Sequence, residues 1–202
     1  MIRPVPGVDG AVLLGGASRR MGRDKARLAL GGVACLTRVT DVLSEVCETI
    51  YLVGGDPPDV TRGHRIPDPA GPRCPLRGLV AALEASRAPF VLTLATDLPL
   101  ISSALLAALA EAPPADAVVP RDEGGIHPLC ARYRREPVLA VARRRLASDA
   151  LSLRGVLSEM GTQFLEGAAL RAVDPDGTAL SNVNTPEDAA RVDASLASSR
   201  VD

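Results

Sequence analysis

Strand-like and helix-like segments alternate along the first half of the chain, and this alternation constrains the fold more than any other feature. Apolar runs typical of buried strands occur at residues 10–14, 49–53 and 90–94, and each is closed by glycine, proline or polar residues. Apolar residues recur at helical spacing within residues 35–47 and 76–87. The alternation predicts a three-layer α/β/α fold, in which helices cover both faces of a mostly parallel sheet.

Weaker signals continue after this part of the chain. No internal repeat or low-complexity linker separates the segments, so we expect residues 1–202 to form a single domain. The remaining expected segments are extended at residues 61–66, 117–119, 127–133 and 163–173, and helical at residues 102–111, 136–147 and 152–160.

The composition excludes several classes of function. Aromatic residues make up 2% of the chain, which argues against a stacking platform for single-stranded nucleic acid. The formal net charge is −1 without a long block of like charges, so no polyanion-binding surface is predicted. The sequence also lacks an apolar leader and a run of about 18 apolar residues that could span a membrane. We therefore expect a soluble cytoplasmic protein that binds neither nucleic acid nor membranes.

The four cysteines carry no metal-binding signature. Cys35, Cys47, Cys74 and Cys130 form no C-x-x-C pair, and neither histidine stands near them in ligand spacing. Free thiols, buried or half-buried in a protein of a reducing compartment, are the better interpretation than a zinc site.

A glycine-rich loop, residues 15–25, follows the first predicted strand. Gly15 and Gly16 allow backbone N–H groups to approach an anion closely, and Ser18 adds a hydroxyl. Arg20 and Lys25 add the positive charge that a triphosphate needs. The loop matches neither the Walker A pattern nor the G-x-G-x-x-G fingerprint. We interpret it as a phosphate-binding loop of another type, with a plain structural turn as the alternative.

Asp97 lies three residues after the strand predicted at residues 90–94. A carboxylate at the end of a buried strand is well placed for Mg²⁺, which takes one or two protein carboxylates together with substrate phosphates and water. Capping of the following loop is the alternative role for this side chain. Ligands of parallel α/β sheets bind outside the carboxyl ends of the strands, so we expect residues 15–25, 54–58 and 95–99 to lie near the site.

Two other segments have both structural and chemical interpretations. The glycine- and proline-rich residues 68–78 lead into a helix and, taken alone, predict only a loop. Near the C-terminus, Thr185, Pro186 and Asp188 form a helix-start signal. The amide groups of Asn182 and Asn184 just before it could contact a phosphate or a polar ring.

Neither the histidine nor the arginines of the second half predict a site by themselves. His127 lacks a partner nucleophile, because no G-x-S-x-G elbow is present. An arginine cluster is typical of a solvated helix face, although it could also bind an anionic substrate or partner. Its members are Arg132, Arg134, Arg135, Arg143, Arg144 and Arg145.

Residues 13–25 resemble the L-x-G-G-x-S-x-R-M-G-x-D-K signature of the MobA family, nucleotidyltransferases that make the guanine dinucleotide form of the molybdenum cofactor. Further segments are similar to the family's motifs and follow its order along nearly the whole chain. They are Gly71 with residues 75–78 (P-L-R-G), residues 96–99 (T-D-L-P), residues 127–133 (H-P-L-C-A-R-Y) and residues 182–188 (N-V-N-T-P-E-D).

The resemblance implies a Rossmann-like nucleotidyltransferase that uses GTP and Mg²⁺ to transfer GMP to Mo-molybdopterin, releasing pyrophosphate. It places a nucleotide-binding half at about residues 8–115 and an acceptor-binding half at about residues 116–195. Its implied catalytic residues are Arg20, Lys25 and Asp97, the last as the Mg²⁺ ligand. Its implied nucleotide-binding residues are Leu13, Gly15, Gly16, Ser18 and Lys25, with Asp68 and Gly78 near the guanine, and its acceptor-side residues are Asn182 and Asn184.

The sequence departs from the family pattern at three places, and the smallest change is Leu14, which replaces the more usual alanine before the glycines. Many members carry an asparagine near the base soon after the second strand, where this chain has Gly54-Gly55-Asp56-Pro57-Pro58. Arg73 and Cys74 interrupt the usual Gly-Pro-Leu run. Cytidylyl transfer to molybdopterin, transfer to a sugar or alcohol phosphate, and a non-catalytic nucleotide-binding protein therefore stay open. Molybdoenzymes or cofactor-delivery proteins are the implied partners.

Overall fold

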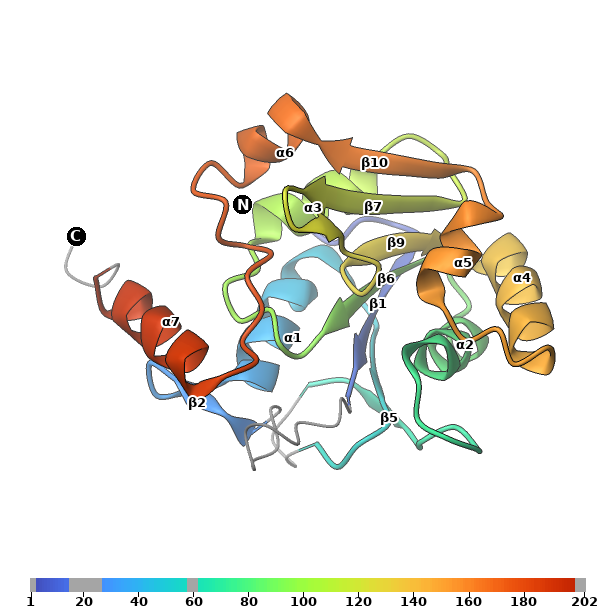
Figure 1. Cartoon of the computed structure of the whole chain (residues 1–202), viewed down its shortest axis with the longest axis horizontal. Helices are drawn as coiled ribbons and strands as arrows, with labels where there is room; N and C mark the ends of the chain where they lie inside the picture. The colour runs from blue at the N-terminus through green and yellow to red at the C-terminus, as the bar shows by residue number, and fades with distance from the viewer. Residues whose placement is uncertain (1–2, 15–26, 58–61, 199–202) are drawn as a thin grey trace.

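The computed structural model describes residues 3–14, 27–57 and 62–198 (Figure 1). Within them, a mixed sheet has the strand order β10-β7-β9-β6-β1-β4-β5, with β8 paired to β7, and a small hairpin joins β2 to β3. The strands are β1 Val8–Leu13, β2 Ala29–Leu30, β3 Val33–Ala34, β4 Ile50–Val53, β5 His64–Ile66, β6 Phe90–Ala95, β7 Ala117–Asp122, β8 Gly125–Ile126, β9 Ala131–Arg134 and β10 Thr162–Glu166. The helices are α1 Cys35–Val46, α2 Pro75–Ala85, α3 Ser103–Glu111, α4 Arg135–Ala147, α5 Leu153–Ser158, α6 Gly167–Val173 and α7 Pro186–Ser198.

The centre of the sheet is parallel. Strand β1 pairs in parallel with β4 and β6, so that Val12 lies beside both Leu52 and Leu94. Strand β9 is antiparallel to both β6 and β7, so β7 runs in the same direction as β6. Strands β5 and β10 are parallel to their neighbours β4 and β7. The carboxyl ends of these parallel strands therefore share one edge, which we call the carboxyl edge.

Helices cover both faces of this sheet, as the alternation predicts. Helices α1, α3 and α6 lie on one face, and α2, α4 and α5 lie on the other (Figure 1). Successive strand residues point to opposite faces, so Val12 packs with the first group and Ala11 with the second. Leucine, valine and alanine fill most of the core. The predicted three-layer α/β/α fold with a mostly parallel sheet is confirmed.

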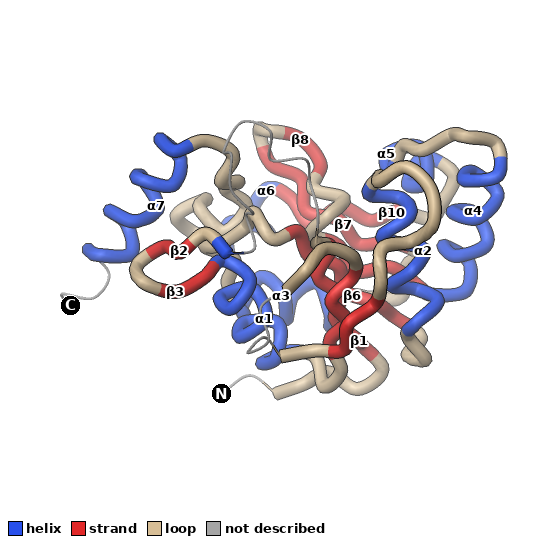
Figure 2. The backbone as a smooth tube through the Cα atoms, turned by 90° about the horizontal axis from the view of Figure 1, so that it is seen from below, coloured by secondary structure: helices blue, strands red, loops and turns tan. Residues whose placement is uncertain are grey.

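The C-terminal helix packs at one end of the molecule. Helix α7 lies against the β2–β3 hairpin in both views (Figures 1 and 2). Leu30 of the hairpin and Val192 of the helix share a small apolar cluster with Val183. The backbone N–H of Gly31 donates to the Asp193 carboxylate at 2.6 Å. These contacts fix the position of the segment that precedes α7.

Two extended segments were predicted too long. Residues 127–130 form a turn, in which the Cys130 N–H donates to the His127 carbonyl at 2.9 Å, and the strand begins only at Ala131. The segment at residues 163–173 is a strand only as far as Glu166. Gly167 then adopts a φ of 58° and begins helix α6. Both differences, the turn at residues 127–130 and the helix that begins at Gly167, depend on backbone conformation, which the pattern of apolar residues does not predict.

Arg132 does not belong to a solvated helix face. It is 2% exposed, and its guanidinium donates to the carbonyls of Ala110, Ala112 and Pro113 at 2.7–3.0 Å. Other arginines of the predicted cluster do form surface ion pairs, for example Arg143 with Glu84 at 2.7 Å. The side chains of Arg132 and Arg143 therefore have different roles, one structural and the other on the surface.

The lengths and hydropathies of the helices exclude a membrane span within the described part of the chain. Cys35, Cys47 and Cys130 are buried and Cys74 is half-buried, and all four are free thiols. The prediction of buried or half-buried thiols is confirmed.

Candidate active site

The described structure reaches the start of the glycine-rich loop. Strand β1 ends at Leu13, and the Leu14 N–H donates to the Val53 carbonyl at the end of β4 at 2.8 Å. The chain therefore enters the loop from the carboxyl edge, where parallel α/β sheets bind their ligands. The predicted phosphate-binding residues Gly15, Gly16, Ser18, Arg20 and Lys25 lie outside the described residues.

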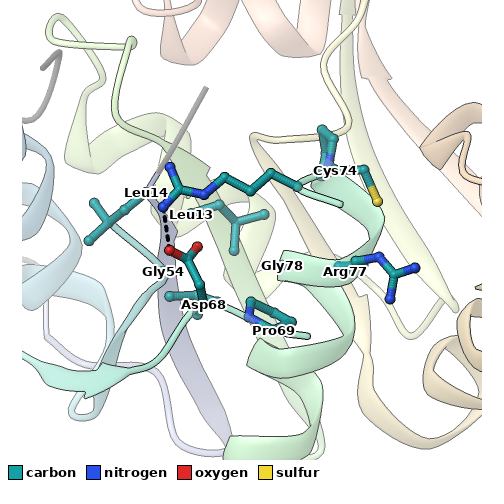
Figure 3. Close-up of a pocket in the computed structure, with 11 residues that line it drawn as sticks. Leu13, Leu14, Gly54, Asp68, Pro69, Cys74, Arg77 and Gly78 are labelled. Atoms are coloured by element: carbon teal, nitrogen blue, oxygen red, sulfur yellow. Dashed lines mark hydrogen bonds and ion pairs between the residues drawn. The ribbon is translucent and has the colours of Figure 1, made fainter. Parts of the chain in front are cut away.

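A pocket opens beside this point, between the ends of β1, β4 and β5 and the start of α2 (Figure 3). It brings together the predicted residues Leu13, Asp68 and Gly78. Asp68 comes from the loop after β5, whereas Gly78 lies in the first turns of α2. The complete lining is Leu13, Leu14, Val53, Gly54, Asp68, Pro69, Arg73, Cys74, Pro75, Arg77 and Gly78.

Glycines at the end of β4 allow the walls of this pocket to approach closely. Gly54 and Gly55 have φ values of 74° and 63°, a region that glycine occupies without steric cost. A Cβ atom on Gly54 would lie 2.5 Å from Asp68 Oδ1, and one on Gly55 would lie 2.9 Å from Leu14 Cβ. This wall therefore presents backbone atoms to a ligand and no side chain.

Two arginines line the pocket in different orientations. The Arg73 guanidinium pairs with the Asp68 carboxylate, with 2.5 Å between Nη2 and Oδ2. The Arg77 side chain points away from Asp68 and donates to the Ala70 carbonyl at 2.9 Å. Sequence reasoning assigned neither arginine to a site, although the interruption at residues 73–74 was a visible signal.

Asp97 lies on the carboxyl edge, two residues beyond the end of β6, and is half-buried. Its backbone carbonyl accepts the Val183 N–H at 2.9 Å. Val183 is 1% exposed, whereas Asn182 and Asn184 on either side of it are exposed. This hydrogen bond brings the two predicted acceptor-side asparagines next to the predicted metal ligand.

The half-buried carboxylate of Asp97 is compatible with Mg²⁺, a hard cation that binds oxygen ligands. Among the described residues, no group of three or more histidine, cysteine, aspartate or glutamate side chains could enclose an ion. A single carboxylate at a strand end leaves most coordination positions to phosphate oxygens and water, which is the usual arrangement for Mg²⁺.

The helix start predicted at Thr185 is confirmed. The Asp188 N–H donates to Thr185 Oγ1 at 3.1 Å, and the Asp188 carboxylate accepts the N–H groups of Asn184 and Thr185, both at 3.0 Å. The bond from Asn184, followed by those from Thr185, holds the pKa of Asp188 below its ordinary value. The capping box thus also holds the backbone of Asn184 in place.

A wider cavity lies further along the carboxyl edge, at the ends of β7 and β10 beside α6. The sequence did not single it out. Arg121 pairs there with Glu166, and Asp174 accepts the N–H groups of Thr178 and Ala179. His127 packs nearby, with its Nε2 atom 2.9 Å from Asp122 Oδ2 but without the alignment of a hydrogen bond.

The parallel sheet and the pocket at its carboxyl edge define an α/β protein of the nucleotide-binding type. Comparison with known families then identifies the group. Residues 10–163 match the MobA-like NTP transferase domain, and the chain belongs to this family.

Relatives and solved structures agree with this assignment. The chain is 30% identical over 199 residues to a molybdenum cofactor guanylyltransferase of Desulfosudis oleivorans, covering 96% of this chain and 98% of the relative. It is 35% identical over 193 residues to one from Cereibacter sphaeroides, covering 93% and 96%. Molybdopterin-guanine dinucleotide biosynthesis protein A from Archaeoglobus fulgidus has the same fold, with a TM-score of 0.81, 23% identity, and coverage of 94% of this chain and 99% of that chain.

The fold also extends to a cytidylyltransferase. The 2-C-methyl-D-erythritol 4-phosphate cytidylyltransferase of Thermus thermophilus superimposes with a TM-score of 0.69 and 15% identity, covering 93% of this chain and 98% of that chain. The architecture is therefore a Rossmann-like nucleotidyltransferase fold that is shared by enzymes named for different nucleotides. The fold therefore does not determine which base is bound.

Proposed function

We propose that the protein transfers GMP from GTP to the molybdenum cofactor, Mo-molybdopterin, and releases pyrophosphate. The names of the relatives support this activity. The main structural support for this function is the hydrogen bond from the Val183 N–H to the Asp97 carbonyl. It joins the segment with the two predicted acceptor-side asparagines to the predicted metal ligand at the end of β6. A transfer reaction needs both substrates at one place, and this contact brings their predicted binding groups together.

In this proposal, one domain divides its surface between two substrates. Residues of about 8–115 bind the nucleotide, with Leu13, Asp68 and Gly78 around the guanine. Residues of about 116–195 bind the acceptor, with Asn182 and Asn184 toward the pterin. The nucleotide's α-phosphate would lie on the carboxyl edge between them, near Asp97.

The proposed mechanism is an in-line displacement. A phosphate oxygen of the acceptor attacks the α-phosphorus of GTP, a new P–O bond forms, and the bond to the pyrophosphate oxygen breaks. The nucleophile is already ionised, so no general base is required, and His127 has no part in the reaction. Arg20 and Lys25 stabilise the charge that moves onto pyrophosphate. Asp97 would hold Mg²⁺, which supplies charge neutralisation between the two anionic substrates.

A pyrophosphate-release assay tests this function directly. The purified protein is given each of the four ribonucleoside triphosphates, Mg²⁺ and Mo-molybdopterin. We expect release with GTP that depends on the acceptor. Absence of release with every nucleotide would overturn the enzymatic function, whereas a preference for CTP would overturn only guanylyl transfer.

A further inference from the structure

The pocket beside β1 presents one acceptor group and one donor group next to each other. The Asp68 carboxylate offers oxygen lone pairs, and the Arg73 guanidinium, 2.5 Å away, offers N–H groups (Figure 3). Around them, Leu13, Leu14 and Pro69 are apolar. A planar ring in this pocket would therefore be distinguished by its hydrogen-bonding edge.

We infer that Arg73 is a specificity-determining residue that selects guanine by donating to its O6 and N7 atoms. This inference rests on the proposed function, which places the guanine beside Asp68. The carboxylate would accept the N1–H and the 2-amino group, while the guanidinium contacts the oxygen side of the same ring. Arginine donating to O6 and N7 is the commonest specific contact to guanine in nucleic-acid recognition.

The other bases do not satisfy this pair of groups. Adenine has an amino group where guanine has O6, so it would point a donor at Arg73. Cytosine likewise presents an amino donor at the equivalent position. Uracil offers an oxygen and one N–H but lacks the second donor for Asp68. Among the common bases, guanine has an acceptor for Arg73, its O6 atom, next to two donors for Asp68, its N1–H and 2-amino groups.

The ion pair between the two side chains is compatible with base binding. It uses one of the five N–H donors of Arg73 and one lone pair of Asp68 Oδ2, and a carboxylate accepts about four hydrogen bonds. The pair also orients both groups before the nucleotide arrives. The Arg73 and Asp68 side chains are 66% and 37% exposed, so the pair itself contributes little to folding stability. Its loss is therefore expected to affect ligand affinity rather than the fold.

Two of the departures from the family pattern meet in this pocket. Gly54 and Gly55 occupy the end of the second long strand, where many members place an asparagine, and they present no side chain. Arg73 belongs to the interruption of the Gly-Pro-Leu run and extends to the same pocket. Arg77, four residues later, is directed to the Ala70 carbonyl and cannot replace it there. The glycines remove the polar side chain that an asparagine would provide, and Arg73 supplies a different polar side chain to the same pocket.

Equilibrium binding measured by calorimetry tests the inference without needing the acceptor. The ligands are GTP, ITP, ATP and CTP, and the variants are Arg73→Ala and Arg73→Lys. Because ITP retains O6 and N7 but lacks the 2-amino group, we expect Arg73→Ala to weaken GTP and ITP equally, by roughly ten- to a hundredfold. Binding of ATP and CTP should change little. Arg73→Lys should recover only part of the GTP affinity, because lysine lacks the planar fork.

Arg143→Ala is the matched control. Arg143 also forms an exposed pair with a carboxylate, that of Glu84, but it lies on α4 away from the pocket. It should therefore leave all four affinities unchanged. Unchanged GTP affinity in Arg73→Ala, or an equal loss for all four nucleotides, would overturn the inference, the latter because Arg73 would then act on the phosphates.

Asp68→Asn separates failure of this inference from failure of the proposed base pocket. The asparagine cannot accept two donors as the carboxylate does, so the preference for GTP over ITP should disappear. If Asp68→Asn loses this preference while Arg73→Ala binds GTP normally, only the role of Arg73 is wrong. If Asp68→Asn retains the preference for GTP over ITP, the guanine does not lie beside Asp68. The proposed position of the base and the proposed role of Arg73 would then both be wrong.

Discussion

Single residues set the width of the pocket at the carboxyl edge. Gly54 lies between Leu14 and Asp68, and its φ of 74° places its backbone where other residues are strained. Asp97 and Asp68 stand on the same edge but have different surroundings. Asp97 follows the central strand β6, and its carbonyl accepts the Val183 N–H, whereas Asp68 pairs with Arg73.

Gly54→Ala should damage both the fold and nucleotide binding. The new Cβ atom would lie 2.5 Å from Asp68 Oδ1 and displace the carboxylate. We expect a loss of about 1–3 kcal/mol in the free energy of unfolding from the strained φ, together with weaker GTP binding. Gly32→Ala is the control, because Gly32 has a φ of 79° and no atom within 4 Å of an added Cβ. It should show the loss of stability but normal GTP affinity; equal affinities in both variants would contradict the prediction.

Asp97→Asn should abolish most of the turnover while preserving the fold. The substitution keeps the shape of the side chain but removes the charge that would hold Mg²⁺, so we expect a loss of roughly a hundredfold or more in kcat. Pyrophosphate release is followed across a Mg²⁺ titration, with circular dichroism to check folding. Asp41→Asn, an exposed change on α1, should behave as wild type. Full activity of Asp97→Asn would remove this carboxylate from the mechanism.

At the scale of elements, the site depends on how α7 begins. The capping box of Thr185 and Asp188 holds the Asn184 backbone, and the contact with the β2–β3 hairpin holds the helix itself. Val183 then joins this unit to the end of β6. Three elements far apart in sequence thus determine where Asn182 and Asn184, the predicted acceptor-side residues, lie.

Thr185→Ala tests this arrangement. Losing the hydroxyl that accepts the Asp188 N–H should cost about 1 kcal/mol of stability. It should also raise the KM for the acceptor more than the KM for GTP, because the Asn184 backbone loosens. Ser152→Ala removes a similar cap from α5, where Ser152 Oγ accepts the Gly155 N–H at 3.3 Å. This control should lose comparable stability with neither KM changed; an unchanged acceptor KM in Thr185→Ala would contradict the role of the box.

The capping carboxylate should also show a defined pH dependence. The N–H groups of Asn184 and Thr185 hold the pKa of Asp188 below its ordinary value of 3.8. A depressed pKa stabilises the folded state above the unfolded-state pKa, and this contribution is lost as the pH falls through the folded-state pKa. The difference in stability between the wild type and Asp188→Asn, measured by urea unfolding, should therefore be constant near neutral pH and shrink on strong acidification. A difference that grows with acid would contradict this sign.

At the scale of the whole molecule, the core covers both faces of the sheet and encloses most of the thiols. Burial, together with the nearby Asp9 charge, raises the pKa of Cys47 to about 12, and burial raises the pKa of Cys130 to about 12. Both thiols are thus protonated near neutral pH as well as shielded. Cys74 is half-buried and lines the pocket beside β1.

Alkylation should therefore distinguish these cysteines. In the native protein, iodoacetamide should label Cys74 first, whereas Cys47 and Cys130 should react only after unfolding in urea. GTP should slow the labelling of Cys74, because this residue lines the proposed nucleotide pocket and a bound nucleotide would cover its thiol. Peptide mass spectrometry at successive times measures each site. Native labelling of Cys130 as fast as that of Cys74 would contradict the enclosed core.

Local features of the fold were predictable from the sequence because they depend on neighbouring residues. The helical spacing of Leu36, Val39 and Leu43 indicates α1, and the Ser102 hydroxyl accepts the Leu105 N–H as a helix cap. Arg132 depends instead on distant residues, because its guanidinium donates to carbonyls about twenty residues earlier in the chain. The sequence predicts an extended segment at residues 127–133 but also groups Arg132 with arginines typical of a solvated helix face, and it does not indicate which loop packs over this side chain.

The α/β class and the longer strands and helices of the first half follow from sequence patterns alone, and so does the carboxylate Asp97 at a strand end. The family resemblance added Asp68 and made the asparagines before α7 site candidates. Three contacts became visible only in the folded chain: Arg73 pairs with Asp68, Gly54 leaves room for that carboxylate, and the Val183 N–H donates to the Asp97 carbonyl. The physical reason is the range of the interactions. Periodicity and capping act within a few residues, whereas a pocket forms where strand ends and loops distant in sequence are packed together.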